Sequence, residues 1–172
     1  EKFTFASAGN ASNVADLTRS VHNIAGTSSA DHGYSIGGLS SDVIDRFPFA
    51  SDSNATDVGD ITANRGNLVG SSDTDYGYVA GGESKSNIIE RFANASSANS
   101  ADVGDITVGR ANAAGCSSAT HGFTAGGDAE ETVPNVIDKY AFASSGDSVD
   151  WGDISGNRSG SAGASDEDYG YV

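Results

Sequence analysis

The chain has 172 residues and a formal net charge of −15, from 24 acidic and 9 basic side chains. A surface this acidic repels nucleic acid and anionic membranes, so we expect no nucleic-acid binding. No apolar run reaches the ~18 residues of a membrane-spanning helix, so we expect no membrane insertion. Cys116 is the single cysteine, which excludes an intrachain disulfide and a cysteine-based zinc site.

One sequence pattern recurs four times along the chain. Each copy contains a short run in which apolar and charged residues alternate and which ends in an aromatic anchor, as in residues 43–47, Val-Ile-Asp-Arg-Phe. The anchors are spaced by 44, 45 and 48 residues: Phe3, Phe47, Phe92 and Tyr140. Alternation with a period of two predicts a half-buried strand. The low content of large aliphatic residues is typical of disordered chains, but recurrence in register predicts a folded repeat protein.

Each anchor is followed at fixed distances by an aspartate and two glycines. The aspartate lies 13 residues past the anchor: Asp16, Asp60, Asp105 and Asp153. One glycine follows ten residues after the aspartate and another, which precedes an aromatic residue, 17 residues after it. In the first three copies a Gly-Gly pair then ends the strand. In the third complete copy these markers predict four strands, near residues 113–117, 122–125, 136–142 and 151–155, with the longest loop between residues 127 and 136.

The repeat divides the chain into three complete units and two partial ones. Residues 23–66, 67–111 and 112–159 are the complete units; residues 1–22 hold the third and fourth strands of a split unit, and residues 160–172 the first two strands of a further or closing unit. Four strands in about 45 residues predict an all-β fold of β-propeller blades. The two ends could share a blade and close a four-bladed ring, but the junction lacks about ten residues, which favours a segment of a longer array.

The marker residues resemble those of the kelch repeat. That family has Gly-Gly at the end of the second strand, an aromatic residue in the third and tryptophan in the fourth; here Gly-Gly occurs in three copies, the aromatic residue in four and tryptophan once, at Trp151. Segments 121–127, 135–140 and 103–110 are also similar to repeats in virion structural proteins of marine and cyanobacterial phages. The resemblance implies a kelch-like β-propeller at a particle surface, in a tail fibre, appendage or decoration protein.

The position before the second glycine of each copy is a first candidate ligand site. It holds His32, Tyr76, His121 and Tyr169. Imidazole and phenol groups at equivalent positions of a ring could surround a central opening and bind a sugar or a metal. Packing between neighbouring strands is the alternative interpretation.

Aspartates crowd the loop that leads to the repeated aspartate and form a second candidate site. The candidate calcium ligands are Asp52, Asp57, Asp60, Asp147, Asp150 and Asp153. Calcium binds about six or more hard oxygen atoms, which such loops could supply, although their spacing is not that of an EF-hand. The alternative is that the repeated aspartate accepts backbone N–H hydrogen bonds at a turn. Apart from calcium, no cofactor is predicted.

A recurring arginine has a structural explanation. Arg65, Arg110 and Arg158 lie five residues past the repeated aspartate, where the first copy has Val21. Because a planar guanidinium suits a partly buried ion pair, we expect this arginine to pair with a strand carboxylate. The candidate carboxylates are Asp45, Glu90 and Asp138.

The chain contains none of the common catalytic motifs: no Gly-x-Ser-x-Gly, phosphate-binding loop or His-Glu-x-x-His. We therefore expect a non-enzymatic structural or interaction protein, located at a virion surface or otherwise extracellular. Its expected partners are other virion subunits or further blades of the same chain, and a host-surface glycan or receptor. A carbohydrate-binding, lectin-type propeller with one weak site in each blade is the alternative.

Overall fold

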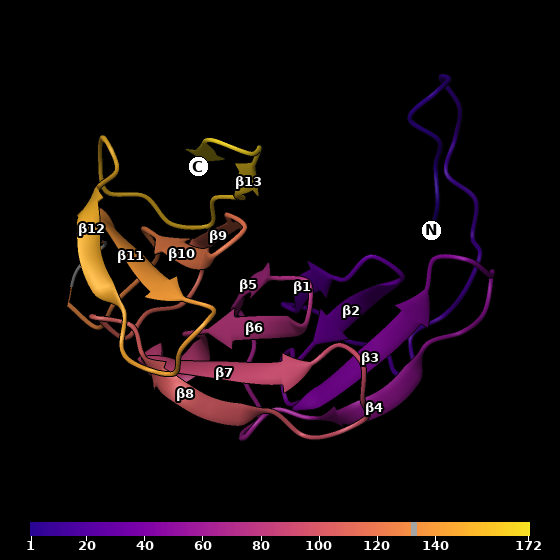
Figure 1. Ribbon diagram of the computed structural model, residues 1–172, viewed down its shortest axis with the longest axis horizontal. Helices are drawn as coiled ribbons and strands as arrows, with labels where there is room; N and C mark the ends of the chain where they lie inside the picture. The colour runs from indigo at the N-terminus through magenta and orange to yellow at the C-terminus, as the bar shows by residue number, and fades with distance from the viewer. Residues whose placement is uncertain (132–133) are drawn as a thin grey trace.

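The computed structural model describes residues 1–131 and 134–172 and confirms the all-β class (Figure 1). Three four-stranded antiparallel sheets and one two-stranded sheet follow each other along the chain. The first sheet consists of β1 (Ala25–Ser28), β2 (His32–Ile36), β3 (Val43–Pro48) and β4 (Thr56–Asp60). The second consists of β5 (Val69–Ser72), β6 (Tyr76–Ala80), β7 (Ile88–Ala93) and β8 (Ala101–Asp105). The third consists of β9 (Ala114–Ser117), β10 (His121–Ala125), β11 (Val136–Ala141) and β12 (Val149–Asp153), and the two-stranded sheet of β13 (Ala164–Ser165) and β14 (Gly170–Tyr171).

Within each sheet the strands lie in chain order, and each pairs antiparallel with the next. Each four-stranded sheet therefore comes from one of the complete sequence units. Positions 132 and 133, in the long loop predicted between β10 and β11, lie outside the described residues. The helical element of the described chain is one 3₁₀ turn, η1 (Glu83–Lys85), and in that part of the chain no helix is long and apolar enough to cross a membrane.

The second glycine of each unit lies under the ring of the aromatic anchor. Gly77 on β6 is directly opposite Phe92 on β7, and a Cβ atom at Gly77 would fall inside the van der Waals radius of that ring. The same relation joins Gly33 to Phe47 and Gly122 to Tyr140. The sequence keeps glycine at this position because the ring of the neighbouring strand occupies the space of a side chain.

A β-bulge recurs in the fourth strand of each sheet. Gly59, Gly104 and Gly152 all have φ of 152°, a conformation that favours glycine, next to a shift in register with the third strand. In each case the aspartate two residues earlier accepts the glycine N–H at 3.1 Å.

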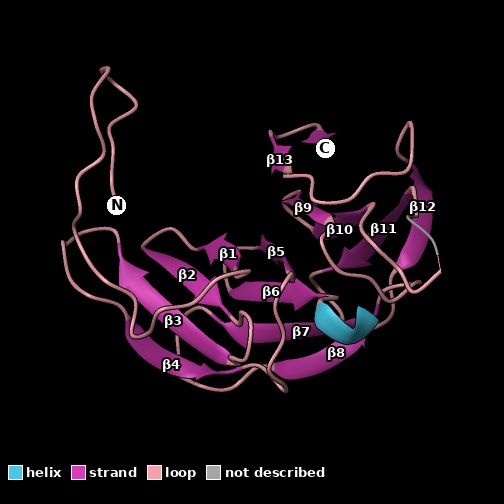
Figure 2. Ribbon diagram, turned by 180° about the vertical axis from the view of Figure 1, so that it is seen from behind, coloured by secondary structure: helices cyan, strands magenta, loops and turns pink. Residues whose placement is uncertain are grey.

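The sheets are arranged around a shared inner edge (Figures 1 and 2). β1 contacts β5, β5 contacts β9, and β9 contacts β13. Glycine allows this approach, since a Cβ atom at Gly70 of β5 would meet the carbonyl oxygen of Gly26 on β1. Between the first two sheets the core contains Ile36, Ile44 and Val79, all of them fully buried.

The three sheets form an open arc, with the two ends of the chain on opposite sides of the opening (Figure 1). In residues 1–22 the two expected strands are reduced to one isolated bridge between Lys2 and Ser12, and β13 and β14 have two residues each. A strand needs hydrogen-bonded neighbours to be stable. The two partial units lie apart in this arrangement, so neither supplies the neighbours that the other lacks.

Candidate functional site

A buried carboxylate on the third strand of each sheet receives an arginine from the preceding unit. Asp45, Glu90 and Asp138 are fully buried. Arg65 pairs with Glu90 and Arg110 pairs with Asp138, as the sequence predicts. Burial lowers the pKa of Arg110, and the nearby charge of Asp138 acts in the opposite direction. Each pair therefore links one sheet to the next.

Other donors complete the environment of these carboxylates. Thr62 donates to Glu90 from both its backbone N–H, at 2.9 Å, and its hydroxyl, at 2.7 Å. Ser148 Oγ donates to Asp138 at 3.0 Å. The guanidinium groups also donate to backbone carbonyl oxygens, Arg65 to Gly81 at 2.8 Å and Arg110 to Thr124 at 3.0 Å. Because several donors converge on each buried charge, the pairing holds the sheets in one register.

In the partial unit of residues 1–22, a different arginine forms the equivalent ion pair with the first sheet. Position 21 holds valine, but Arg19 Nη1 lies 2.8 Å from Asp45 Oδ2, and its Nη2 donates to the carbonyl of Gly37 at 3.0 Å. Thr18 donates to Asp45 with its backbone N–H and its hydroxyl. Sequence reasoning missed Arg19. The signal for it was Asp45 itself, since a strand carboxylate equivalent to Glu90 and Asp138 requires a partner.

The loop aspartates do not converge on one point. Asp57 and Asp150 accept the N–H groups of their own bulge glycines, and Asp52 forms an exposed ion pair with Lys2 at 2.5 Å. Asp147 accepts the backbone N–H of Asp105, in the preceding sheet, at 3.0 Å. Among the described residues no group of three or more His, Cys, Asp or Glu side chains is placed as metal ligands would be.

The repeated aspartate contributes mainly through its backbone. Asp60 donates its N–H to Asn99 Oδ1 at 3.1 Å, and its carbonyl accepts the N–H of Ser100 at 2.8 Å, so both bonds join the first sheet to the second. Burial, together with the charges of Asp42 and Asp57, raises the pKa of the Asp60 carboxyl. Asp153, the equivalent in β12, is exposed. The geometry therefore gives the calcium hypothesis no support.

The four residues of the first candidate ligand site lie in four different sheets. His32, Tyr76 and His121 begin β2, β6 and β10, and Tyr169 precedes β14. The guanidinium of Arg91, on the adjacent strand β7, lies 4.5 Å from the centre of the Tyr76 ring. His121 Nδ1 is 2.8 Å from Thr120 Oγ1, and burial lowers its pKa. The Arg91–Tyr76 contact is cross-strand packing within one sheet, and the His121 contact is with its neighbour in sequence, so these contacts do not join the four residues into one sugar-binding site.

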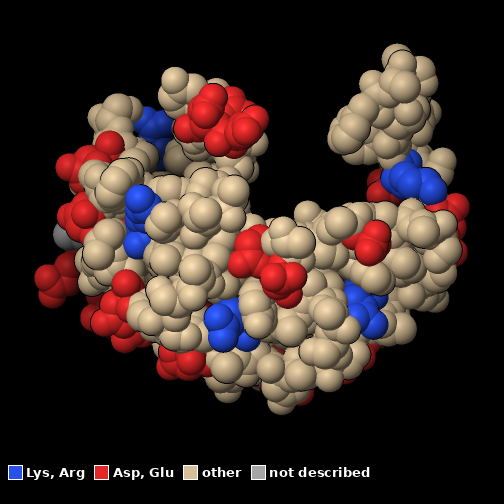
Figure 3. Space-filling view, in the orientation of Figure 1, with Lys and Arg blue, Asp and Glu red and all other residues tan. Residues whose placement is uncertain are grey.

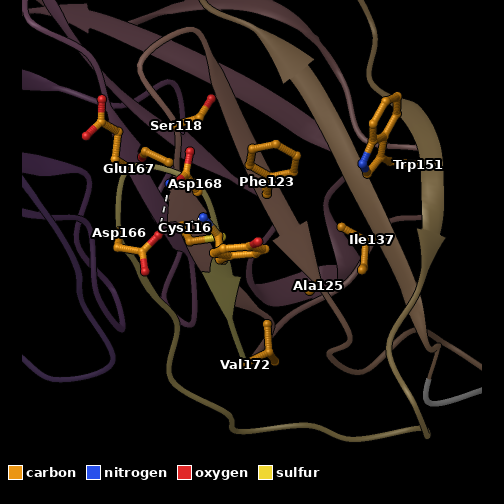
Figure 4. A pocket seen from close by; sticks show the side chains of 13 residues that line it. Cys116, Ser118, Phe123, Ala125, Ile137, Trp151, Asp166, Glu167, Asp168 and Val172 are labelled. Atoms are coloured by element: carbon orange, nitrogen blue, oxygen red, sulfur yellow. Dashed lines mark hydrogen bonds between the residues drawn. The ribbon is translucent and has the colours of Figure 1, made fainter.

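The outer face of the third sheet holds an open hollow of about 270 Å³, whose lining is mostly apolar (Figure 4). Side chains from β9 to β12 line it together with the last residues of the chain: Cys116, Phe123, Ile137, Trp151, Tyr169 and Val172. Burial raises the pKa of the Cys116 thiol, as in a packed rather than a reactive cysteine. Trp151 is 62% exposed, and Lys139 Nζ lies 3.6 Å from its ring centre.

Acidic side chains gather at the same end of the arc (Figure 3). The turn between β13 and β14 contains three of them, Asp166, Glu167 and Asp168. Asp166 accepts the N–H groups of Asp168, at 2.9 Å, and Tyr169, at 2.8 Å, and these bonds lower its pKa. This turn therefore has defined geometry although its side chains are exposed.

No family model and no curated protein matches the chain.

Proposed function

We propose that the chain is a non-enzymatic structural protein of a phage virion surface, in which kelch-like propeller blades present loops for assembly or host binding. The observation that carries the proposal is that the recurring polar residues of the repeat form contacts between neighbouring sheets. The recurring arginine, carboxylate, threonine and aspartate positions bind each sheet to the next. Chemistry repeated in every unit is thus used for stacking, as a scaffold requires.

Two further features agree with this role. The loops carry the length differences between the repeats, which suits surfaces that contact variable partners. The acidic charge favours a dispersed protein that binds through shape and specific contacts rather than through attraction to nucleic acid. The proposed location at a phage virion rests on the resemblance of the repeats to phage virion proteins.

Immunogold electron microscopy of native phage particles tests the proposal. Antibodies against the purified 172-residue chain should label intact virions at a reproducible place, on tail or capsid. Label found on free protein or cell debris, with bare virions from the same preparation, would contradict a virion role. A glycan array run with the same protein distinguishes the lectin-type alternative, which requires reproducible binding to related sugars.

A further inference from the structure

A group of three residues recurs at the contacts between neighbouring units. It consists of the buried carboxylate on the third strand, the arginine that reaches it from the preceding unit, and the residue on the second strand directly opposite the carboxylate. Residues opposite each other in an antiparallel pair have their side chains on the same face of the sheet, so the group lies between the two units. We call each such group a polar centre. The polar centres are Asp45, Arg19 and Ser35; Glu90, Arg65 and Val79; and Asp138, Arg110 and Thr124.

The polar centres occur in two versions, which differ in the length of the carboxylate side chain and in the residue opposite it. The glutamate faces a valine, whereas each of the shorter aspartates faces a hydroxyl group. The pairs are Glu90 with Val79, Asp45 with Ser35 and Asp138 with Thr124. The aspartate version therefore has one methylene group fewer in its carboxylate and one hydrogen-bonding group more.

The aspartate version between the second and third sheets leaves buried polar atoms without hydrogen-bond partners in the described chain. These atoms are Nε and Nη1 of Arg110 and Oγ1 of Thr124, and both residues are fully buried. In the glutamate version one atom of this kind remains, Nε of Arg65, whose Nη1 donates to Ser86 Oγ at 2.7 Å. At the position of Ser86, two residues before the third strand, the third unit has Pro134, which has no hydroxyl. Because buried polar groups in proteins are nearly always paired, the atoms of Arg110 and Thr124 require a ligand.

The chemistry of these atoms selects water as the ligand. A guanidinium group only donates hydrogen bonds, whereas a hydroxyl group both donates and accepts. A metal cation would be repelled by Arg110, and an anion would add an unpaired negative charge where Asp138 already balances the arginine. A water molecule is uncharged, accepts from a guanidinium and donates to a hydroxyl oxygen, and buried water molecules make about three such hydrogen bonds.

The surroundings of Thr124 leave its oxygen available to this ligand. Burial raises the pKa of Tyr140, and the nearby Thr124 hydroxyl acts in the opposite direction. The Thr124 hydroxyl therefore lies on the side of the Tyr140 oxygen and can direct its proton there. Its lone pairs then face away from its own proton and can accept a hydrogen bond from water.

We propose that a water molecule is bound between the second and third sheets, where it accepts a hydrogen bond from Arg110 and donates one to Thr124 Oγ1. An equivalent water binds at the first polar centre, where Nε of Arg19 and Oγ of Ser35 are buried and likewise lack partners in the described residues. A hydroxyl opposite a short carboxylate thus marks a hydrated contact, and the polar centre with Val79 lacks the acceptor that holds the water.

The two versions are consequently exchangeable as pairs and not residue by residue. Thr124→Val alone removes the acceptor and leaves Arg110 and the water unsatisfied. Asp138→Glu alone adds a methylene group where the water binds. The two changes together reproduce the glutamate version, which the chain already uses at Glu90.

Exchange of the two versions tests the proposal. Asp138→Glu/Thr124→Val gives the contact between the second and third sheets the glutamate version, and Glu90→Asp/Val79→Thr gives the contact between the first and second sheets the aspartate version. Oxygen-17 magnetic relaxation dispersion counts long-lived bound water from its oxygen, so proton exchange does not affect it. The first variant should hold about one such water fewer than wild type, and the second about one more. Thr120→Val, which removes an exposed hydroxyl from the turn before β10, is the control that should keep the wild-type count.

Urea unfolding gives a second measurement of the same site. Thr124→Val alone should lower the folding equilibrium constant about tenfold, because it leaves buried donors without an acceptor. Addition of Asp138→Glu should restore most of the loss, since the longer side chain then replaces the water. Thr124→Ser keeps the hydroxyl, so it should keep the water count of wild type.

Three results would overturn the proposal. Equal water counts in wild type and in both exchanged variants would show that no bound water depends on the hydroxyl. Stabilisation of wild type by chloride but not by fluoride at equal ionic strength, absent in Asp138→Glu/Thr124→Val, would identify an anion as the ligand. If the exchanged variants do not fold, a water-selective ¹⁵N spectrum of wild type decides. A bound water gives signals of opposite sign in the NOE and ROE experiments at the Arg110 Nε–H group, and their absence contradicts the site.

Discussion

At the scale of single residues, the stacking of the sheets depends on charge that is buried and paired. Glu90 and Asp138 are inaccessible to solvent, and Arg110 is as well. A buried ion pair adds little net stability, because desolvation offsets the attraction between the charges, but a single unpaired charge is costly. The pair therefore acts against wrong arrangements, since a sheet stacked out of register would leave both charges buried without partners.

Arg110→Leu should destabilise the chain strongly, because it leaves Asp138 buried with its Coulombic partner removed. The expected loss is about 3–5 kcal/mol in the free energy of unfolding. Urea denaturation at neutral pH, followed by circular dichroism, measures it. The double variant Arg110→Leu/Asp138→Leu should recover part of the loss. Arg158→Leu, the same repeat position without a described carboxylate, should leave the midpoint of the dilute protein nearly unchanged; an equal loss in that variant would refute the ion-pair explanation.

Tyr140 links stability to pH in the alkaline range. Its hydroxyl lies 2.7 Å from Ser71 Oγ, and burial raises its pKa to about 12. An unfolded tyrosine titrates near pH 10, so the folded state keeps this proton to higher pH than the unfolded state does. The stability tied to this group is complete below about pH 10 and is lost as pH rises toward about 12, by about 3 kcal/mol.

Urea unfolding at pH steps across that window measures the Tyr140 contribution. Tyr140→Phe should lower stability at neutral pH by removing the Ser71 hydrogen bond, and should also flatten the alkaline slope. Tyr169→Phe, at a 68% exposed position, should keep the wild-type slope. A slope that is equally steep in Tyr140→Phe would assign the alkaline loss to other groups.

At the scale of strands and sheets, the period of the sequence predicted the all-β class and the four-stranded sheets, because its markers have local causes. Glycine under an aromatic anchor and alternation along the third strand both arise within one sheet, so the pattern located the strands to within a few residues. The same register could not reveal Arg19, because a long flexible side chain reaches Asp45 from a different backbone position. The register also grouped His32 with Tyr76 as one candidate site, but the two residues begin strands of different sheets, and their contacts do not form a common site.

Gly77→Ala tests the packing of glycine under the anchor ring. A methyl group there would overlap Phe92, which is itself packed against Tyr34 of the first sheet and cannot withdraw freely. The expected loss is about 1–3 kcal/mol in the free energy of unfolding, seen as a lower thermal midpoint. Gly26→Ala is the control, because its nearest neighbour would be the Tyr34 carbonyl oxygen at 3.9 Å. Equal effects of the two changes would point to backbone entropy rather than overlap.

At the scale of the whole molecule, the second sheet is the only complete sheet of the described chain with another complete sheet on each side. It contributes Val79 and Phe92 to the core shared with the first sheet, and Tyr78 and Ile89 to the core shared with the third. In an array stabilised by nearest-neighbour contacts, opening the middle unit breaks two interfaces, whereas opening an end unit breaks one. Stability should therefore fall from the centre of the arc toward its ends.

Hydrogen exchange followed by mass spectrometry tests this gradient, because amide exchange reports the free energy of local opening. In dilute protein, β6 and β7 should exchange at least about tenfold more slowly than β2 and β3 or β10 and β11. Protection of the third sheet equal to that of the second at the lowest concentration would instead indicate that both of its faces are already covered within one chain, so that the arc closes in solution.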